Sequence, residues 1–453
     1  MKTKYSYKQI WTISYPILIS LIMEQMIGMT DTAFLGRVGE IELGASAIAG
    51  VYYLAIFMMA FGFSIGAQIL IARRNGEGNY KEIGPIFYQG IYFLLAMAVI
   101  LFTFSIVFSP YILKNIISSP HIYDAAESYI HWRVYGFFFS FIMVMFRAFF
   151  VGTTQTKTLT LNSIVMVLSN VVFNYILIFG RFGAPEMGIR GAAIGTFAAR
   201  ILELGIVLFY VWKKDTKVKL FDEKFRDGII GKGSGTVWKT FFKVCIPILT
   251  SGLLWAVSLP MQTAILGHLS ADAIAANSVS STFFQYLKVI VIAIAGASAV
   301  VIGKDIGSND EEKVRCNGRT LSVLYLAIGL LLGTVLFLLR SPLLSMYRLT
   351  PQATLYADHF MIIMSVIMVG MSYQMPVGVG IIQGGGDTKF SMYLNLISVW
   401  CIVMPLSFLA AFYWKLPVEL VVIAVQSDQI FKCLPIFLRF KSYKWIHKLT
   451  AID

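Results

Sequence analysis

Two carboxylates lie inside the first long apolar run of the chain, which extends from Trp11 to Leu35. They belong to Glu24 and Asp31, and with Gly28 between them they follow an i, i+4, i+7 spacing that puts all three on one helix face. An acid in the middle of a membrane helix costs roughly 2.5 to 3.5 kcal/mol on insertion scales. Two acids on one face also repel each other unless one of them binds a proton or a cation. The spacing therefore predicts an ion-coupled site around Glu24 and Asp31.

The composition indicates that these acids lie in a membrane protein. The chain has 453 residues, of which 57% are hydrophobic and only 13% are charged, whereas about a quarter of the residues of soluble domains are charged. Apolar stretches long enough to cross a hydrocarbon core of roughly 30 Å occur twelve times. They lie near residues 11–35, 43–72, 85–113, 128–152, 158–180, 188–212, 241–267, 273–303, 320–340, 353–383, 390–413 and 418–438. We predict an all-α polytopic membrane protein with twelve transmembrane helices.

The basic residues are distributed unevenly along this chain. Its formal net charge is +13, and most Lys and Arg residues lie at the two ends and in every second connection, above all between Lys213 and Lys239. Cytoplasmic connections of membrane proteins carry such an excess. We therefore expect both termini and the central segment in the cytoplasm and the protein in the cell (inner or plasma) membrane. Because topology accounts for the charge, we expect no binding to nucleic acid.

Neither the amino terminus nor the cysteines and histidines indicate cleavage, cross-linking or catalysis. The first apolar run is too long for a signal peptide and lacks an A-x-A cleavage pattern. The four cysteines have no C-x-x-C spacing, and the five histidines are dispersed without an H-E-x-x-H pattern. We expect no disulfide framework, no metal site built on these residues and no enzymatic activity.

The two halves of the chain repeat each other. YPILIS around Pro16 matches IPILTS around Pro247, and TAFLG from Thr32 matches TAILG from Thr263, at one offset (247 − 16 = 263 − 32 = 231). Because six helices are an even number, both copies enter the membrane from the same side, which predicts two six-helix bundles related by a pseudo-two-fold axis along the membrane normal. The predicted parts are the first bundle at residues 1–212, a cytoplasmic linker at 213–239 and the second bundle at 240–453.

The repeat also predicts where the halves differ. The positions that correspond to Glu24 and Asp31 in the second half hold Trp255 and Gln262. We therefore expect the first bundle to handle the cation. Two such bundles can rock about a central cleft and expose it alternately to each side of the membrane.

Several segments resemble one family of transporters. They are GMTDTAFLGRVGEIELGASAI in the first helix and its loop, NYILIFGRFGAPEMGIRGAAIGT across the fifth and sixth helices, and QGGGDTK after the tenth. In their order along the whole chain they are similar to the multidrug and toxic compound extrusion (MATE) family of bacterial type. The resemblance implies export of amphipathic, often cationic, organic compounds by antiport against sodium ions or protons.

The family pattern matches this chain at one acid and departs from it elsewhere. Asp31 matches the family's first-helix acid. One bacterial branch has a second acid in the fifth helix, four residues after an Asn, and here Asn170 is followed by Asn174 instead. Another branch has acids in the seventh and tenth helices, where this chain has Trp255 and, approximately, Ser372. These departures put the family's usual ion stoichiometry in doubt.

We hypothesise that Glu24 and Asp31 together form the cation site, with neutral oxygens supplied by Asn170, Asn174 and Thr196. Oxygen ligands suit a hard cation such as sodium, whereas a proton would need only one of the carboxylates. No cofactor is expected besides this coupling ion. The alternative is that Glu24 lies near a water-filled vestibule and is merely solvated.

Other charged residues within helices have simpler explanations. Arg200 with Glu203, and Asp428 with Lys432, stand three or four residues apart and are expected to neutralise each other. Arg133 and Arg147 border the fourth helix, where snorkelling to an interface explains at least one of them. The roles of Arg200, Glu203 and Asp428 stay open at this point.

We expect substrate to bind in the cleft through aromatic, amide and thioether side chains. Trp255 is the candidate for stacking, and the other candidates are Gln262, Tyr135 and Met26. The expected partners are a small organic substrate and the lipid bilayer, and the chain is expected to be a monomer. A flippase for lipids or lipid-linked saccharides is the alternative function.

Overall fold

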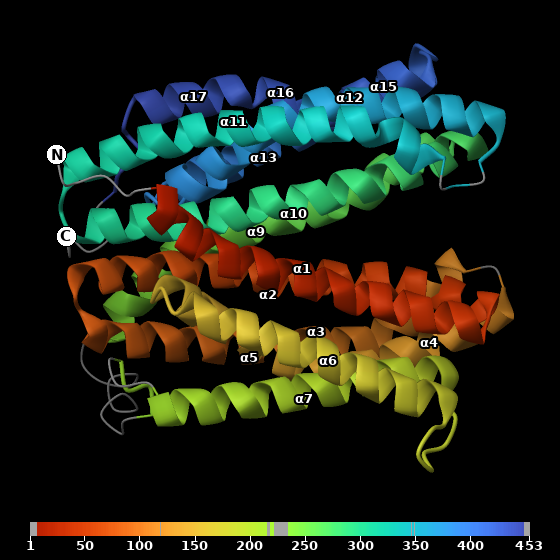
Figure 1. The fold of residues 1–453 in the computed structure, drawn as a ribbon, viewed down its shortest axis with the longest axis horizontal. Coiled ribbons are helices and arrows are strands. Elements are labelled where there is room, and N and C mark those ends of the chain that lie inside the picture. Colours follow the sequence, from red (N-terminus) through yellow and green to blue (C-terminus); the bar gives the residue numbers. More distant parts are fainter. Residues whose placement is uncertain are drawn as a thin grey trace. The chain divides into compact units, whose positions relative to one another are not determined.

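The computed structural model describes residues 7–117, 119–214, 218–221, 234–345, 347 and 349–447. Helices make up most of them (Figure 1). An isolated β-bridge joins Gly386 to Ile446. The helices of the first half are α1 (Tyr7–Val38), α2 (Glu40–Glu77), α3 (Tyr80–Ile116), α4 (Pro120–Arg133), α5 (Gly136–Gly152), α6 (Thr156–Phe179) and α7 (Gly188–Lys214).

The second half repeats this order with more interruptions. Its helices are α9 (Ser234–Gly267), α10 (Ala271–Gly307), α11 (Glu311–Leu344), α12 (Pro351–Met375) with η1 (Pro376–Ile382), α13 (Thr388–Asn395) with η2 (Leu396–Val403), α14 (Met404–Phe408) and η3 (Leu409–Tyr413), then α15 (Val418–Gln426), α16 (Asp428–Phe431) and α17 (Cys433–Lys441). The π-helical segment η1 begins at Pro376, and the short α-helix α14, between η2 and η3, has Pro405 as its second residue. A proline lacks the backbone donor that a regular helical turn needs.

These helices confirm the predicted fold class. Within the described residues, ten segments are long and apolar enough to cross a membrane, and α4 with α5 makes an eleventh if the two count as one span. The long helix α9 covers the predicted seventh span, which completes an all-α polytopic fold of twelve helices in two bundles. The predicted fourth span, 128–152, is not one straight helix, because α4 and α5 meet at a bend of 52°.

The chain packs as two compact units. The first unit comprises Ile19–Cys245, and the second unit comprises Ile246–Asp453 together with Met1–Leu18. The helices α1 and α9 therefore each contribute their first turns to one unit and the rest to the other. This division describes packing and not the sequence repeat, so the boundaries at 212 and 240 stay a prediction.

In the first unit, α6 packs along α7, and α2 packs against α4 and α5. Ile27 of α1 joins Met166 and Val167 of α6 and Ala199 of α7 in one buried apolar cluster. These contacts hold the polar faces of α1, α6 and α7 against one another, which brings Asp31 next to the amides of α6.

In the second unit, α12 packs against both α10 and α11. The QGGGDTK segment packs against Trp445 and His447, and His447 N donates to Gly385 O (2.9 Å). Trp445 is fully buried, and its Nε1 donates to Phe440 O (3.0 Å). A Cβ at position 385 would lie 2.3 Å from the Trp445 ring. The glycine is therefore required for close packing of the carboxyl-terminal segment.

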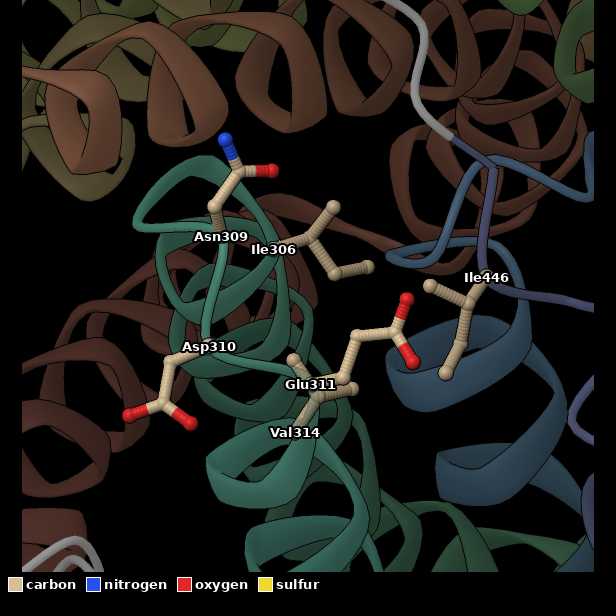
Figure 2. Close-up of a pocket in the computed structure, with 6 residues that line it drawn as sticks. All are labelled: Ile306, Asn309, Asp310, Glu311, Val314 and Ile446. Carbon is tan, nitrogen blue, oxygen red and sulfur yellow. The ribbon is translucent and has the colours of Figure 1, made fainter.

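A small open pocket lies at the turn between α10 and α11 (Figure 2). Its lining consists of Ile306, Asn309, Asp310, Glu311, Val314 and Ile446. Asp310 accepts a hydrogen bond from the backbone N–H of Lys313 (3.0 Å) and so caps α11. This acid has a structural role at the helix start.

Candidate functional site

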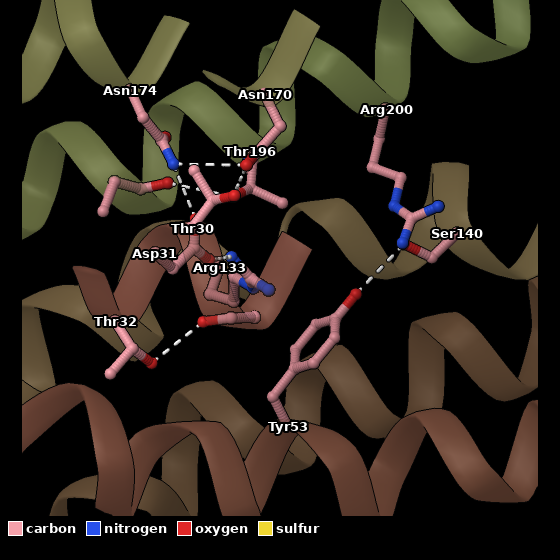
Figure 3. A network of polar contacts seen from close by, with 12 residues as sticks. Thr30, Asp31, Thr32, Tyr53, Arg133, Ser140, Asn170, Asn174, Thr196 and Arg200 are labelled. Carbon is pink, nitrogen blue, oxygen red and sulfur yellow. Dashed lines mark hydrogen bonds and ion pairs between the residues drawn. The ribbon is translucent and has the colours of Figure 1, made fainter. Parts of the chain in front are cut away.

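Asp31 is buried between three helices of the first unit. Its side chain on α1 is met by Asn174 of α6, whose Nδ2 donates to Oδ1 (2.6 Å), and by Arg133 of α4, whose Nη1 lies 3.2 Å from Oδ2 (Figure 3). The residue is 5% exposed. Both carboxylate oxygens are therefore engaged away from bulk water.

The amide of Asn174 continues into a polar chain across α6 and α7. Its Nδ2 also donates to Asn170 Oδ1 (3.3 Å), Asn170 Nδ2 donates to Thr196 Oγ1 (2.9 Å), and Thr196 Oγ1 donates to Ala192 O (3.0 Å). Asn170 and Asn174 share a face of α6 because they are four residues apart, and both are fully buried. The structure thus brings four of the five predicted cation-site residues into one network.

This network contains a free acceptor. Within the part of the chain that the structure describes, the buried Oδ1 of Asn174 has no hydrogen-bond partner. Gly195 of α7 provides its space, since a Cβ there would lie 2.5 Å from this oxygen. A buried acceptor without a donor is costly and calls for a partner. One carboxylate with amide and hydroxyl oxygens is a donor set that fits a hard monovalent cation such as sodium.

Arg133 already supplies a positive charge at Asp31. Its guanidinium carbon lies 4.7 Å from the centroid of the Tyr53 ring and 5.5 Å from that of Tyr129, and Tyr53 is in turn hydrogen-bonded to Ser140 (3.1 Å). Snorkelling does not describe this arginine, whose side chain is 13% exposed and points to the acid. One feature of the sequence indicated this partner: a buried carboxylate needs a cation, and Arg133 borders a predicted helix.

Glu24 lies in a different network from Asp31. Arg200 of α7 binds Glu24 through Nη2 and Glu203 through Nη1 (2.9 Å), and Asn162 Nδ2 donates to the other oxygen of Glu203 (2.9 Å). The predicted Arg200–Glu203 pair is confirmed. Glu24 is the most accessible member, with its side chain 32% exposed, so its role in cation binding stays a prediction.

The candidate substrate residues are distributed over both units. Met26 is 39% exposed on α1, and Tyr135 packs edge-on against Phe102, with ring centroids 5.1 Å apart. In the second unit, Gln262 is half-buried and the Trp255 ring lies below the Lys288 ammonium, 4.7 Å from its centroid. Contact with substrate stays a prediction for all four candidates.

The second unit contains its own buried polar cluster. Lys432 Nζ donates to Asp428 (2.8 Å) and to Asn395 Oδ1 (3.0 Å), and Asn395 Nδ2 donates to Ser251 (2.6 Å). The predicted Asp428–Lys432 pair is confirmed. The sequence analysis did not single out Lys288 of α10, which lies close enough to this cluster for the charge of Asp428 to act on it.

The family comparison agrees with the fold and the repeat. The MatE family model matches residues 16–176 and again residues 247–409. The two matches begin 231 residues apart, at Pro16 and Pro247, as the repeat predicts. The chain therefore belongs to the MatE family of membrane transporters and is not an enzyme.

Named relatives and solved structures are similar over nearly the whole chain. A probable multidrug resistance protein NorM of Thermotoga maritima is 24% identical over 97% of this chain and 93% of its own length. Multidrug resistance protein MdtK of Photorhabdus laumondii is 23% identical over 88% and 86%. A structure of the Vibrio cholerae MATE transporter VcmN has a TM-score of 0.85 at 18% identity and covers 98% of each chain. That of the eukaryotic MATE transporter AtDTX14 has a TM-score of 0.84 at 18% identity, over 97% and 96%.

Proposed function

We propose that this protein is a secondary antiporter for multidrug efflux, which exports amphipathic organic compounds, cationic ones among them, in exchange for sodium ions or protons. Membership of the MatE family and the relatives named NorM and MdtK support multidrug export. The observation that carries ion coupling is Asp31, a buried carboxylate held by an amide chain that includes a free oxygen.

Coupling requires the driving ion and the substrate to favour different conformations. At Asp31 an entering cation would take over part of the charge balance that Arg133 provides, and Asn174 would turn its free oxygen toward the ion. A proton would neutralise the same carboxylate. Either event weakens the Asp31–Arg133 pair, which connects α1 to α4 and is therefore placed to change helix packing.

The energy of one ion is enough for useful export. Moving one charge through 100 mV releases about 2.3 kcal/mol, and each 1.4 kcal/mol supports about a tenfold ratio of concentrations. One driving ion per cycle would therefore support more than tenfold accumulation of a neutral substrate.

The test is reconstitution in liposomes with a sodium gradient and a pH gradient imposed separately, while export of rhodamine 6G is followed by fluorescence. We expect one gradient to drive export in the wild type, and Asp31→Asn to lower the rate at least tenfold with normal expression, because the amide keeps the Asn174 contact but carries no charge. Thr32→Ala is the matched control, since Thr32 is the exposed neighbour of Asp31. Full transport by Asp31→Asn would refute the role of this carboxylate.

A further inference from the structure

Within the described part of the second unit, one buried charge has no ion-pair partner. Among its described residues, five charged side chains are buried, and four of them take part in ion pairs. Asp305 pairs with Lys313, Asp387 with Arg439, and Asp428 with Lys432. The exception is Lys288, which is 9% exposed and lies over the ring of Trp255.

The nearby carboxylate cannot fully compensate this ammonium. Asp428 acts on Lys288 through its charge, but its oxygens are already bound by Lys432 Nζ (2.8 Å) and, at both positions, by Gln429 Nε2 (2.9 Å). Two lysines therefore share one acid, which leaves a net charge of +1 inside a membrane bundle. An intramembrane charge of this kind is costly and is typical of a functional site.

Comparison of the two repeats shows that this excess positive charge is specific to the second unit. Ser20 contacts Ser163 (2.7 Å) in the first unit, and Asn395 contacts Ser251 (2.6 Å) in the second, at offsets of 231 and 232. With these offsets Trp255 corresponds to Glu24.

Lys432 corresponds to Arg200 in the same way. In the first unit two acids, Glu24 and Glu203, are bound by Arg200, and the charge of Arg147 also acts on Glu24. The second unit has two lysines, one acid and an aromatic ring at the corresponding place. The charges at this place are thus balanced in the first unit and leave an excess positive charge in the second.

We propose that Lys288, Trp255 and the Lys432–Asn395 pair form a binding site for the monovalent oxyanion of an amphipathic compound, either the carboxylate of an organic acid or the phosphodiester of a lipid headgroup. A single negative charge balances the net charge of the cluster, and the ammonium of Lys288 is the donor that needs it. The Trp255 ring offers apolar surface to the body of the same molecule. The site names a substrate class for the proposed exporter: compounds with an anionic group, alone or beside a cationic one.

The test measures binding to the purified full-length protein in detergent and needs no gradient. The probes are 1-pyrenebutyrate and, separately, dihexanoyl-phosphatidylglycerol as its competitor, with fluorescence anisotropy as the readout and 1-pyrenemethylammonium as the cationic comparison. Lys288→Met keeps the length of the side chain and removes its charge, Lys288→Gln is a second neutral variant, and Lys288→Arg restores the charge. Lys415→Met, in an exposed loop of the same unit, is the matched control.

We expect both neutral variants to weaken pyrenebutyrate binding at least tenfold, Lys288→Arg to restore it to within about threefold, and Lys415→Met to leave it unchanged. The cationic probe should not lose affinity in any variant. Displacement by the phosphatidylglycerol that also depends on Lys288 would assign the site to lipid headgroups, and the absence of displacement would assign it to free organic acids. Failure of both anions to bind, or equal binding by the neutral variants, would overturn the proposal.

The anion site rests on the proposed function only in so far as the bound anion is a transported substrate. The antiport proposal and the anion-site proposal can therefore fail separately. If neither gradient moves any compound while pyrenebutyrate still binds through Lys288, the antiport proposal is wrong and the anion site stands. If a gradient drives export of rhodamine 6G but neither anion binds, the antiport proposal stands and the anion site is wrong.

Discussion

Asp31 and Arg133 form a buried ion pair at the place where we propose that the driving cation binds. Removing one partner of a buried pair generally costs about 3 to 5 kcal/mol, because the other charge is left without compensation. In the observed arrangement the arginine compensates the carboxylate, and in the proposed cycle an ion at the free Asn174 oxygen would do so instead. Competition between the two would set how tightly the driving ion binds.

This competition predicts the effect of Arg133→Gln. Without the guanidinium, Asp31 depends on the ion for its charge balance, so the concentration of driving ion at half-maximal stabilisation should fall about tenfold. Turnover should slow because the ion leaves less easily. Thermal unfolding across a series of sodium concentrations and pH values measures the first effect, and Arg181→Gln, in an exposed loop, is the control. Weaker ion binding in Arg133→Gln would show that the arginine supports the site and does not compete for it.

At the scale of elements, the α6–α7 contact positions the amides. The Asn pair on α6 faces α7, and Gly195 lets the two helices approach so closely that its missing side chain is replaced by the Asn174 amide. Helices approach closely where small residues form the interface. The site therefore depends on a residue that takes no part in its chemistry.

Two glycine-to-alanine substitutions on α7 distinguish an effect on helix propensity from an effect on the close α6–α7 contact. In Gly195→Ala the new Cβ would lie 2.5 Å from Asn174 Oδ1, so the amide must shift from its position beside Asp31, and we expect ion-driven export to fall at least tenfold. Gly205→Ala is the matched control, because a Cβ there meets nothing within 4 Å. The measurement is the dependence of export rate on ion concentration in proteoliposomes. Equal behaviour of the two variants would exclude a role for this close contact.

At the scale of the whole molecule, the two halves repeat the same order of helices but differ in their buried charges. The family match covers both halves, but the first unit pairs its buried acids with arginines, whereas the second leaves a lysine in excess. Duplication preserves the helix positions, because packing depends on them, and leaves the few polar positions free to diverge. We propose that this divergence lets ion and substrate act on different bundles.

The membrane orientation is a prediction that cysteine labelling can test. Because positive residues concentrate in cytoplasmic connections, the turn after α6 should face outward and the turn before α11 inward. After replacement of the four native cysteines, Arg181→Cys should react with a membrane-impermeant maleimide in intact cells. Glu312→Cys should react only after permeabilisation, and both positions are exposed. Labelling of Glu312→Cys in intact cells would contradict the expected topology.

The sequence alone was sufficient for the helices, the duplication and much of the candidate site. Apolar runs and the offset of 231 are read directly along the chain, so ten or eleven spans in the described residues and the two family matches confirm them. Asp31, Asn170, Asn174 and Thr196 are four of the five residues predicted for the cation site, and they lie in one network. The physical reason is that polar groups within apolar helices must satisfy one another in the membrane.

Only the tertiary structure decided which charges meet. Glu24 and Asp31 share a helix, yet Arg200 binds the first and Arg133 the second, and Lys288 is left with an aromatic ring and a carboxylate that is already bound. The physical reason is range: hydrophobic periodicity is a local property of the chain, whereas an ion pair between helices depends on how each helix is rotated and how closely it packs against its neighbours.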